Sequence, residues 1–241
     1  MRVRVISLRR SVARRLAFEE RNGHLDYAFV DAVDGRALPE SVRADPALFA
    51  ADLRYGLGAR GLALSHLGLW QQAAAGDEAL TVAEDDAIFR RDFSDRADAI
   101  LAALPPGWDL AVWGWNFDSI LSVAEMPGVS PVGLIFDEAR LRGAIPAFQA
   151  MTVPPRGLRL AACLGTPAYT VSPQGAAKLI ARCFPLRRES VTLPIVDMEI
   201  ENVGIDVAMS AAYPEIAAYA AFPPLVVTEN DKSGSTVQGG A

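Results

Sequence analysis

Short apolar runs alternate with longer amphipathic segments along most of this chain. Five apolar runs have the length and composition of buried strands, at Val3–Leu8, Tyr27–Ala32, Leu80–Ala83, Asp109–Trp113 and Pro167–Val171. Segments with helical spacing lie between or after them, at Ser11–Arg21, Gly61–Ala75, Asp92–Leu104 and Ala176–Phe184. Strands that alternate with helices are typical of a parallel sheet. The pattern predicts an α/β fold with a mostly parallel central sheet flanked by helices.

Several residues mark where the predicted helices begin and end. Ser172 followed by Pro173 is a strong start signal, because serine caps the first turn and proline fits the first helical position. Ser11 and Ser94 are the predicted caps of two other helices. Gly76 is the predicted end of the helix that precedes it.

The pattern weakens between residues 119 and 159, where prolines and glycines are scattered. This stretch is predicted to form excursions over the sheet rather than core elements. The chain has no internal repeat and no sharp change of composition, so we expect one domain over residues 1–230. Residues 231–241 are polar and contain glycine, which predicts a flexible tail.

Composition narrows the class of protein. The chain has 241 residues, of which 51% are hydrophobic, enough for a substantial core. No apolar run reaches the length of a transmembrane helix, and the N-terminus lacks the apolar region of a signal peptide. Cys163 and Cys183 have no metal-like spacing and are predicted to be reduced core residues of a cytoplasmic protein.

Charge is unevenly distributed. A net charge of −6 argues against a nucleic-acid partner. Six arginines nevertheless fall within the first fifteen residues. Such a segment fits phosphate binding, contact with an anionic membrane surface, or a solvated helix face.

Three acids, Glu84, Asp85 and Asp86, follow the apolar run Leu80–Ala83. Charge at the carboxyl end of a strand lies where open α/β folds keep their ligand crevice. Side chains alternate along a strand, so Glu84 and Asp86 are expected to point one way and Asp85 the other. Two facing carboxylates repel each other unless a cation lies between them, and Mg²⁺ or Mn²⁺ suits such oxygen ligands. A solvated acidic turn explains the three residues equally well.

Other familiar sites are excluded by their missing motifs. The chain has no Gly-x-Gly-x-x-Gly after the first strand, no Walker loop, no His-Glu-x-x-His and no Gly-x-Ser-x-Gly. A magnesium-dependent phosphatase would need an aspartate nucleophile on the first strand, and Val3–Leu8 has none. A carboxylate-rich cleft remains, which is compatible with metal-assisted chemistry on a phosphorylated substrate.

Four stretches, in order along the chain, resemble glycosyltransferase family 25, the lipooligosaccharide-type sugar transferases. They are Val5–Ser11 with Arg14-Arg15, Gly58–His66, Thr81–Ala87, and Gly165–Ala176 followed by Val196-Asp197. Ala59 and Leu62 stand where the family commonly has glutamate and cysteine, and Thr228–Ser233 follows its C-terminal pattern only loosely.

The resemblance implies a GT-A-type fold and a sugar-nucleotide donor, usually a UDP-hexose such as UDP-galactose. It also implies Mn²⁺ or Mg²⁺ and inverting transfer to a lipopolysaccharide, a lipooligosaccharide or another cell-surface glycan. The expected location is cytoplasmic, with peripheral contact at the inner membrane as an alternative. The rival interpretation is a GT-A-like module that binds a sugar nucleotide without catalysis. Joint retention of Glu84, Asp86 and Asp197 argues against that rival.

The resemblance also assigns roles to residues. Asp197 is the predicted catalytic base, expected at the carboxyl edge of the sheet across the crevice from the acidic turn, with Glu199 as second choice. Asp86 and Glu84 are the predicted metal ligands. The donor is expected to contact a larger set: Ser7, Leu8, Arg9, Arg15, Ser65, Glu84 and Asp85.

His66 has two interpretations. It shares a helical stripe with Leu62 and Leu69, which favours a core histidine, whereas the resemblance favours a catalytic position. Trp113, Trp115 and Asn116 follow a strand end and fit stacking on a sugar or base, with core packing as the default for Trp113. Tyr169 is predicted to be a core residue rather than a catalytic one.

Overall fold

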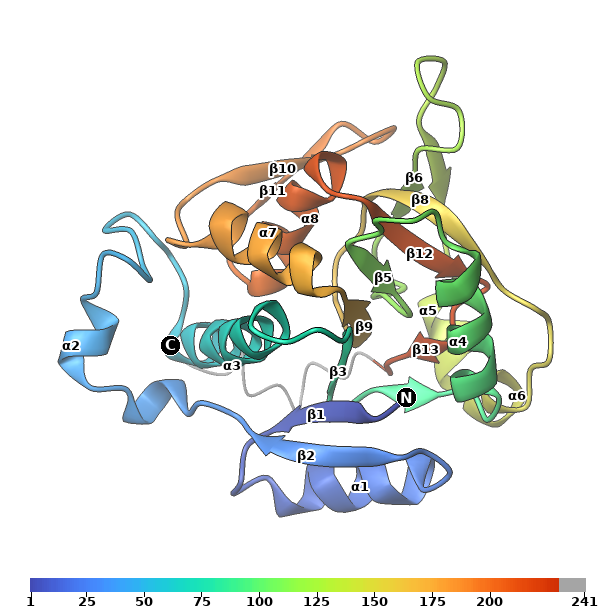
Figure 1. Ribbon diagram of the computed structural model, residues 1–241, viewed down its shortest axis with the longest axis horizontal. Helices are drawn as coiled ribbons and strands as arrows, with labels where there is room; N and C mark the ends of the chain where they lie inside the picture. Colours follow the sequence, from blue (N-terminus) through green and yellow to red (C-terminus); the bar gives the residue numbers. More distant parts are fainter. Residues whose placement is uncertain (230–241) are drawn as a thin grey trace.

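A nine-stranded sheet forms the centre of the computed structural model, which describes residues 1–229 (Figure 1). Its strands run in the order β2-β1-β3-β9-β5-β12-β8-β6-β7. Their bounds are β1 Val3–Ser7, β2 Tyr27–Asp31, β3 Leu80–Glu84, β5 Leu110–Val112, β6 Leu121–Val123, β7 Val132–Leu134, β8 Arg156–Ala162, β9 Ala168–Val171 and β12 Ala218–Phe222. Two small sheets pair β4 (Ile88–Phe89) with β13 (Val226–Val227), and β10 (Ser190–Leu193) with β11 (Met198–Glu201).

Helices cover both faces of the sheet. The bounds are α1 Val12–Asn22, α2 Glu40–Arg43, α3 Leu57–Ala74, α4 Phe93–Ala103, α5 Glu138–Arg142, α6 Ile145–Gln149, α7 Pro173–Cys183 and α8 Ile205–Ala212, with short 3₁₀ turns at Gly35–Ala37 and Tyr213–Glu215. Apolar residues of α3, α7 and α8 share one core cluster with the sheet, and those of α1 and α4 share another. The predicted α/β class, with a central sheet flanked by helices, is confirmed.

The sheet is mixed. β1 pairs in parallel with β2 and β3, and β5 pairs in parallel with β12. β9 runs antiparallel between β3 and β5, and β8, β6 and β7 complete an antiparallel edge. The sheet is therefore parallel on the side of the acidic turn, where strand ends gather at one edge.

Some of the residues predicted to start helices do so, and others do not. Ser172 caps α7 as predicted, with its Oγ accepting a hydrogen bond from the Gly175 amide at 3.0 Å. The Ser94 prediction is wrong, since Asp92 occupies the N-cap position of α4. The helix predicted from Gly61 begins at Leu57. Gly61 therefore lies inside the helix. Glycine is needed at this position because a Cβ would come within 2.5 Å of the Val33 carbonyl oxygen and the Gly35 amide.

The prediction for residues 119–159 is wrong. β6 and the start of β8 fall in this stretch and belong to the main sheet, with Leu121, Val123 and Leu158 buried in its core. These strands are short or flanked by proline and glycine, so their periodicity was hidden. β12 also escaped prediction, because its alanines have weak strand propensity.

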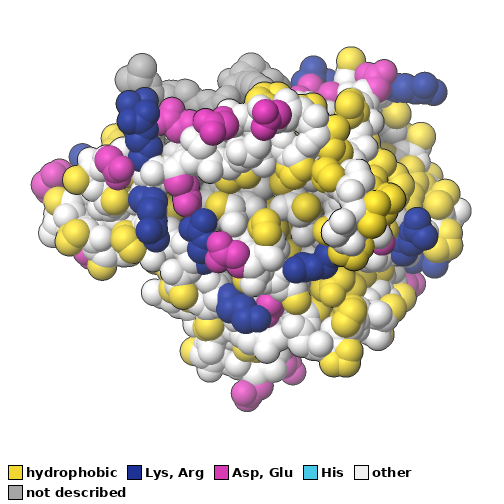
Figure 2. Space-filling view, turned by 90° about the horizontal axis from the view of Figure 1, so that it is seen from above, with side chains coloured by type: hydrophobic (Ala, Val, Ile, Leu, Met, Phe, Trp, Pro, Cys, Tyr) yellow, Lys and Arg dark blue, Asp and Glu magenta, His cyan; other side chains and the backbone are white. Residues whose placement is uncertain are grey.

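Other expectations concern the surface and the thiols. Cys163 and Cys183 are free and buried, as predicted. Within the described residues, no helix is long and apolar enough to cross a membrane. On the face in Figure 2, charges of both signs are interspersed, unlike the basic surface typical of a nucleic-acid binder. The predicted tail 231–241 and most of Thr228–Ser233 lie outside the described residues.

Candidate active site

The acidic turn follows β3 at the sheet edge where β1, β2 and β3 end together. Parallel pairing places Ser7, Asp31 and Glu84 at that edge. The Glu84 amide donates to the Pro167 carbonyl, just before β9, and the chain then turns with the Ala87 amide donating to the Glu84 carbonyl at 3.2 Å. β3, the strand that leads into the turn, is internal to the sheet and third of nine from the β2 edge.

Asp85 is held by the first strand and first helix. It accepts a hydrogen bond from Ser7 Oγ at 2.7 Å and another from Arg14 Nε at 2.7 Å. The same guanidinium lies 3.5 Å from Asp86 Oδ2. These contacts explain why serine stands at the end of β1 and arginine in the first turn of α1: together they fix the acidic turn.

Glu84 and Asp86 carry charges that are poorly compensated. Burial raises the pKa of Glu84, and the negative charges of Asp86, Asp206 and Asp85 raise it further, against Arg14 alone. Burial and Asp85 likewise raise the pKa of Asp86, with Arg14 opposing. A site that holds its acids against this repulsion is suited to a cation.

Asp206 is a further acid within electrostatic reach of Glu84, and it was not among the predicted site residues. It stands in the first turn of α8, and its Oδ2 accepts a hydrogen bond from the Gly165 amide at 2.9 Å. Burial raises the pKa of Asp206, and the charge of Asp118 adds to the rise against the amides of Gly165 and Val207. In sequence it looked like one more acid near the Leu193–Asn202 segment; the available signal was its place at the start of a helix, just after Gly204.

Gly165 holds the Asp206 carboxylate in place through its backbone amide. Its φ is +74°, and a Cβ there would lie 2.2 Å from Asn116 Oδ1, so glycine alone fits between Asn116 and Asp206. Within residues 1–229, three buried polar atoms a few residues from this contact have no hydrogen-bond partner: Trp115 Nε1, Ser119 Oγ and Thr166 Oγ1. Since buried polar groups normally find partners, these atoms indicate a place for water or a ligand.

His66 lies in the core, on α3. Its ring packs against Tyr169, with Nδ1 2.8 Å from the Tyr169 hydroxyl, which also accepts from Trp70 Nε1 at 2.7 Å. Burial lowers the pKa of His66 to about 3, so the ring is neutral near neutral pH. This environment favours the core interpretation. Tyr169 and Trp113 are also fully buried, as their core interpretations required, and Trp115 is buried as well although sugar or base stacking was predicted for it.

The other predicted donor residues have different surroundings. Ser65 Oγ accepts from the Val33 amide at 2.9 Å and donates to the Gly61 carbonyl at 2.8 Å, which ties α3 to the loop after β2. Arg15 binds the Ser7 carbonyl at 2.8 Å and Asp31 at 2.7 Å. Leu8 and Arg9 follow β1, with Leu8 partly buried and Arg9 exposed.

Asp197 is not where the topology was expected to place it. It lies in the exposed turn between β10 and β11, which pair with each other and not with the main sheet. Glu199 is exposed on β11, and Ile195 in the same turn lies against Gly133 of β7. The prediction that this segment returns to the carboxyl edge of the main sheet is therefore wrong, because residues 190–201 form a hairpin of their own.

Comparison with known proteins gives a family match for the N-terminal part of the chain. Residues 1–118 match the family model of glycosyltransferase family 25 (LPS biosynthesis protein). The protein is a glycosyltransferase. The matched part runs from β1 through β5 and contains the whole acidic turn, whereas Asp206 lies beyond it.

Two further comparisons concern single proteins rather than a family model. The comparison of sequences with curated proteins found no match to the glycosyltransferase. Among fifteen matching chains of solved structures is the apo crystal structure of mouse xyloside xylosyltransferase 1, at 13% identity. That alignment covers 89% of this chain and 70% of the mouse chain, with a TM-score of 0.33.

The acids of the glycosyltransferase have the chemistry of ligands for a divalent cation that needs few protein ligands. Glu84 and Asp86 offer hard oxygen ligands beside each other, and Asp206 adds to the negative potential. Across residues 1–229, no three or more His, Cys, Asp or Glu side chains form a ready-made cation site. Mg²⁺ commonly takes one or two carboxylates and completes its shell with water and substrate phosphates. The residues present suit that mode of binding.

Proposed function

We propose that this glycosyltransferase moves a hexose from a UDP-sugar to a lipopolysaccharide, lipooligosaccharide or related cell-surface glycan. The observation that carries the proposal is the acidic turn Glu84–Asp86 at the edge where the parallel strands β2, β1 and β3 end, inside the stretch that matches family 25. The free, buried Cys163 and Cys183 support a reducing, cytoplasmic setting, the side on which nucleotide sugars are expected.

Each part of the acidic turn has a proposed task. Glu84 and Asp86 would hold Mn²⁺ or Mg²⁺, which supplies charge neutralisation for a diphosphate leaving group. Asp85 positions the turn through Ser7 and Arg14. Arg9 follows β1, and Arg15 on α1 reaches the ends of β1 and β2 with its side chain, where a nucleotide could meet both. Arg15 is already oriented by Asp31.

The base is the most open assignment. Inverting transfer needs a group that takes the proton of the acceptor hydroxyl, which typically contributes about 10²–10⁴-fold. We propose Asp206 for this task, since its carboxylate is fixed by Gly165 and lies within electrostatic reach of Glu84. Asp197 remains the prediction from family resemblance, and it projects from the hairpin turn.

The metal assignment is tested by calorimetry with UDP and UDP-galactose, with and without Mn²⁺. Asp86→Asn should abolish the strengthening of UDP binding by Mn²⁺, because it removes a charge and keeps the shape. Asp95→Asn, an exposed acid on α4, is the matched control and should bind as wild type. Metal-dependent binding that survives in Asp86→Asn would refute the assignment.

The base is tested by turnover. Asp206→Asn should lower kcat by about 100-fold or more with little change in UDP affinity, the pattern of an interaction made in the transition state. Asp197→Asn should stay within a few-fold of wild type. The reverse result would assign the base to Asp197, and a large loss from Glu199→Gln alone would assign it to Glu199.

The binding-only module makes a different prediction from the enzyme. It would bind UDP-galactose with Mn²⁺ and release no UDP in the presence of glycan acceptors. A positive UDP-release assay that disappears in Asp86→Asn excludes it.

A further inference from the structure

A pocket of about 500 Å³ lies away from the acidic turn, between α4, the start of β8 and β12. It shares none of its lining residues with the candidate active site. Its volume falls in the range of small-molecule sites, about 300–1,000 Å³. Nothing in the transfer reaction requires it.

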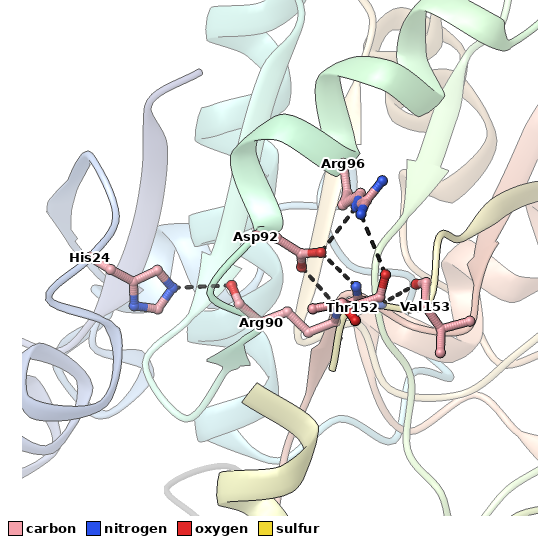
Figure 3. A network of polar contacts seen from close by, with 6 residues as sticks. All are labelled: His24, Arg90, Asp92, Arg96, Thr152 and Val153. Atoms are coloured by element: carbon pink, nitrogen blue, oxygen red, sulfur yellow. Dashed lines mark hydrogen bonds and ion pairs between the residues drawn. The ribbon is translucent and has the colours of Figure 1, made fainter. Parts of the chain in front are cut away.

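A network of two arginines and an aspartate adjoins the pocket through Arg96, which lines it (Figure 3). The fully buried Arg90 side chain donates to Asp92 at 2.9 and 2.7 Å and to the Val153 carbonyl at 3.0 Å. Arg96 donates to Asp92 at 3.0 Å and to the Thr152 carbonyl at 3.4 Å. These bonds hold residues 152–153 against the start of α4, so that the following prolines 154–155 line the pocket.

The pocket carries an excess of positive charge. Arg96, Arg156 and Arg159 line it against a single acid, Glu125, although the whole chain has a net charge of −6. Glu125 already accepts the Arg159 amide at 2.7 Å. This local reversal of sign favours an anion.

Two of these guanidinium groups are oriented in advance. Arg159 donates to the Ala218 carbonyl at 2.8 Å and lies over the ring of Tyr219, while Arg96 is held by Asp92. A guanidinium has five N–H donors, so each keeps donors beyond the bonds that position it. Oriented arginines are well suited to phosphate, which they bind through two parallel bonds.

The remaining wall is apolar. Ile100, Leu104 and the ring of Tyr219 face the pocket with the two prolines. Gly157 opens this side, because a Cβ there would lie 2.7 Å from Leu104 Cδ2. We propose that the pocket binds a phosphorylated ligand whose phosphate bonds to the arginines and whose apolar group packs on Ile100 and Leu104. A soluble phosphate ester and a phospholipid headgroup share this chemistry.

Calorimetry with phenyl phosphate and inorganic phosphate tests the proposal. Wild type should bind phenyl phosphate more tightly than inorganic phosphate, because the ring adds apolar contact. Arg156→Gln should weaken phenyl phosphate by about tenfold through loss of a charged donor. Arg156 is exposed, so this change should leave the melting temperature unaltered. Arg187→Gln, an exposed arginine after α7, is the matched control and should bind as wild type.

A second variant tests the cavity rather than the charge. Ala99→Trp places a large side chain at an exposed helix position that lines the pocket, and it should reduce phenyl phosphate binding several-fold. Unchanged affinity in both Arg156→Gln and Ala99→Trp would overturn the proposal, as would an equal loss in Arg187→Gln. Asp86→Asn should bind phenyl phosphate normally, which keeps this result separate from the proposed transfer reaction.

Sedimentation with vesicles distinguishes the two sources of phosphate. Binding to phosphatidylglycerol vesicles but not phosphatidylcholine vesicles, reduced in Arg156→Gln, supports a lipid headgroup. Phenyl phosphate binding without sedimentation supports a soluble ester. Sedimentation that is equal in wild type and both pocket variants contradicts a lipid at this pocket.

Discussion

Asp92 and Glu84 are carboxylates of one protein with opposite surroundings. Burial pushes the pKa of Asp92 upward, but the hydrogen bonds and charges of Arg90 and Arg96 outweigh it and lower the pKa. Burial raises the pKa of Glu84, and three neighbouring acids add to the rise. The first arrangement stabilises the fold, and the second opposes it. An acid cluster that costs stability at a strand end is typical of a functional site.

The largest expected effect comes from breaking the paired region. Asp92→Asn leaves the buried Arg90 guanidinium without its ionic partner and should lower the free energy of unfolding by about 3 kcal/mol. Urea denaturation measures this difference. Asp95→Asn, an exposed acid in the same helix, should change stability by less than about 0.5 kcal/mol. Equal effects of the two variants would show that the pairing at Asp92 is unimportant.

His66 shows what burial does without a neighbouring charge. Burial lowers its pKa from 6.5 to about 3, so the unfolded chain binds a proton that the folded protein does not. The stability linked to His66 is fully present above pH 6.5 and is lost as the pH falls from 6.5 toward 3. In that window wild type should lose up to about 1.4 kcal/mol per pH unit relative to His66→Leu. Parallel curves of unfolding free energy against pH for the two proteins would contradict this.

Relieving the crowded region should have the opposite sign. Glu84→Gln removes a carboxylate that faces Asp86, Asp206 and Asp85, and should raise the free energy of unfolding by about 1 kcal/mol. The same variant should lose the Mn²⁺ dependence of UDP binding. Urea denaturation and calorimetry on one preparation give both values. A variant that is less stable than wild type would mean that Glu84 serves the fold.

The smallest effect is expected from the same chemical change at the surface. Asp26 pairs with Arg2 at 3.6 Å, and both side chains are more than half exposed. Asp26→Asn should lower the free energy of unfolding by about 0.3 kcal/mol, since exposed pairs gain little over hydrated charges. A loss as large as that of Asp92→Asn would remove the distinction between paired acids in the two settings.

Sequence patterns predicted the parts of the fold that depend on local signals. The strand that leads into the acidic turn, the helix after Ser172 and the burial of Tyr169 all follow from apolar runs and capping residues. β6, β8 and β12 did not, because their residues become strands through pairing with distant parts of the chain. An alanine-rich segment such as Ala218–Phe222 is a strand because β5 and β8 lie beside it.

The candidate site divides in the same way. Glu84, Asp85 and Asp86 were found because three acids close one apolar run. Asp206 was missed because its closeness to Glu84 depends on where α8 begins and on the loop at Gly165, about forty residues earlier in the chain. The pairing of β10 with β11, which keeps Asp197 in its own hairpin, is likewise a choice between two partners that alternation alone cannot make.

The strand order of the central sheet also determines when the sheet can be completed as the chain is synthesised. β5 ends at Val112, yet both strands that pair with it come later, β9 from Ala168 and β12 from Ala218. A ribosome adding about 5–20 residues per second leaves one edge of β5 unpaired for roughly 5–20 seconds. Open strand edges recruit other chains, so the nascent protein needs shielding during that interval. The strands that end in the acidic turn are made first, but the sheet that supports them is completed only when the last strand arrives.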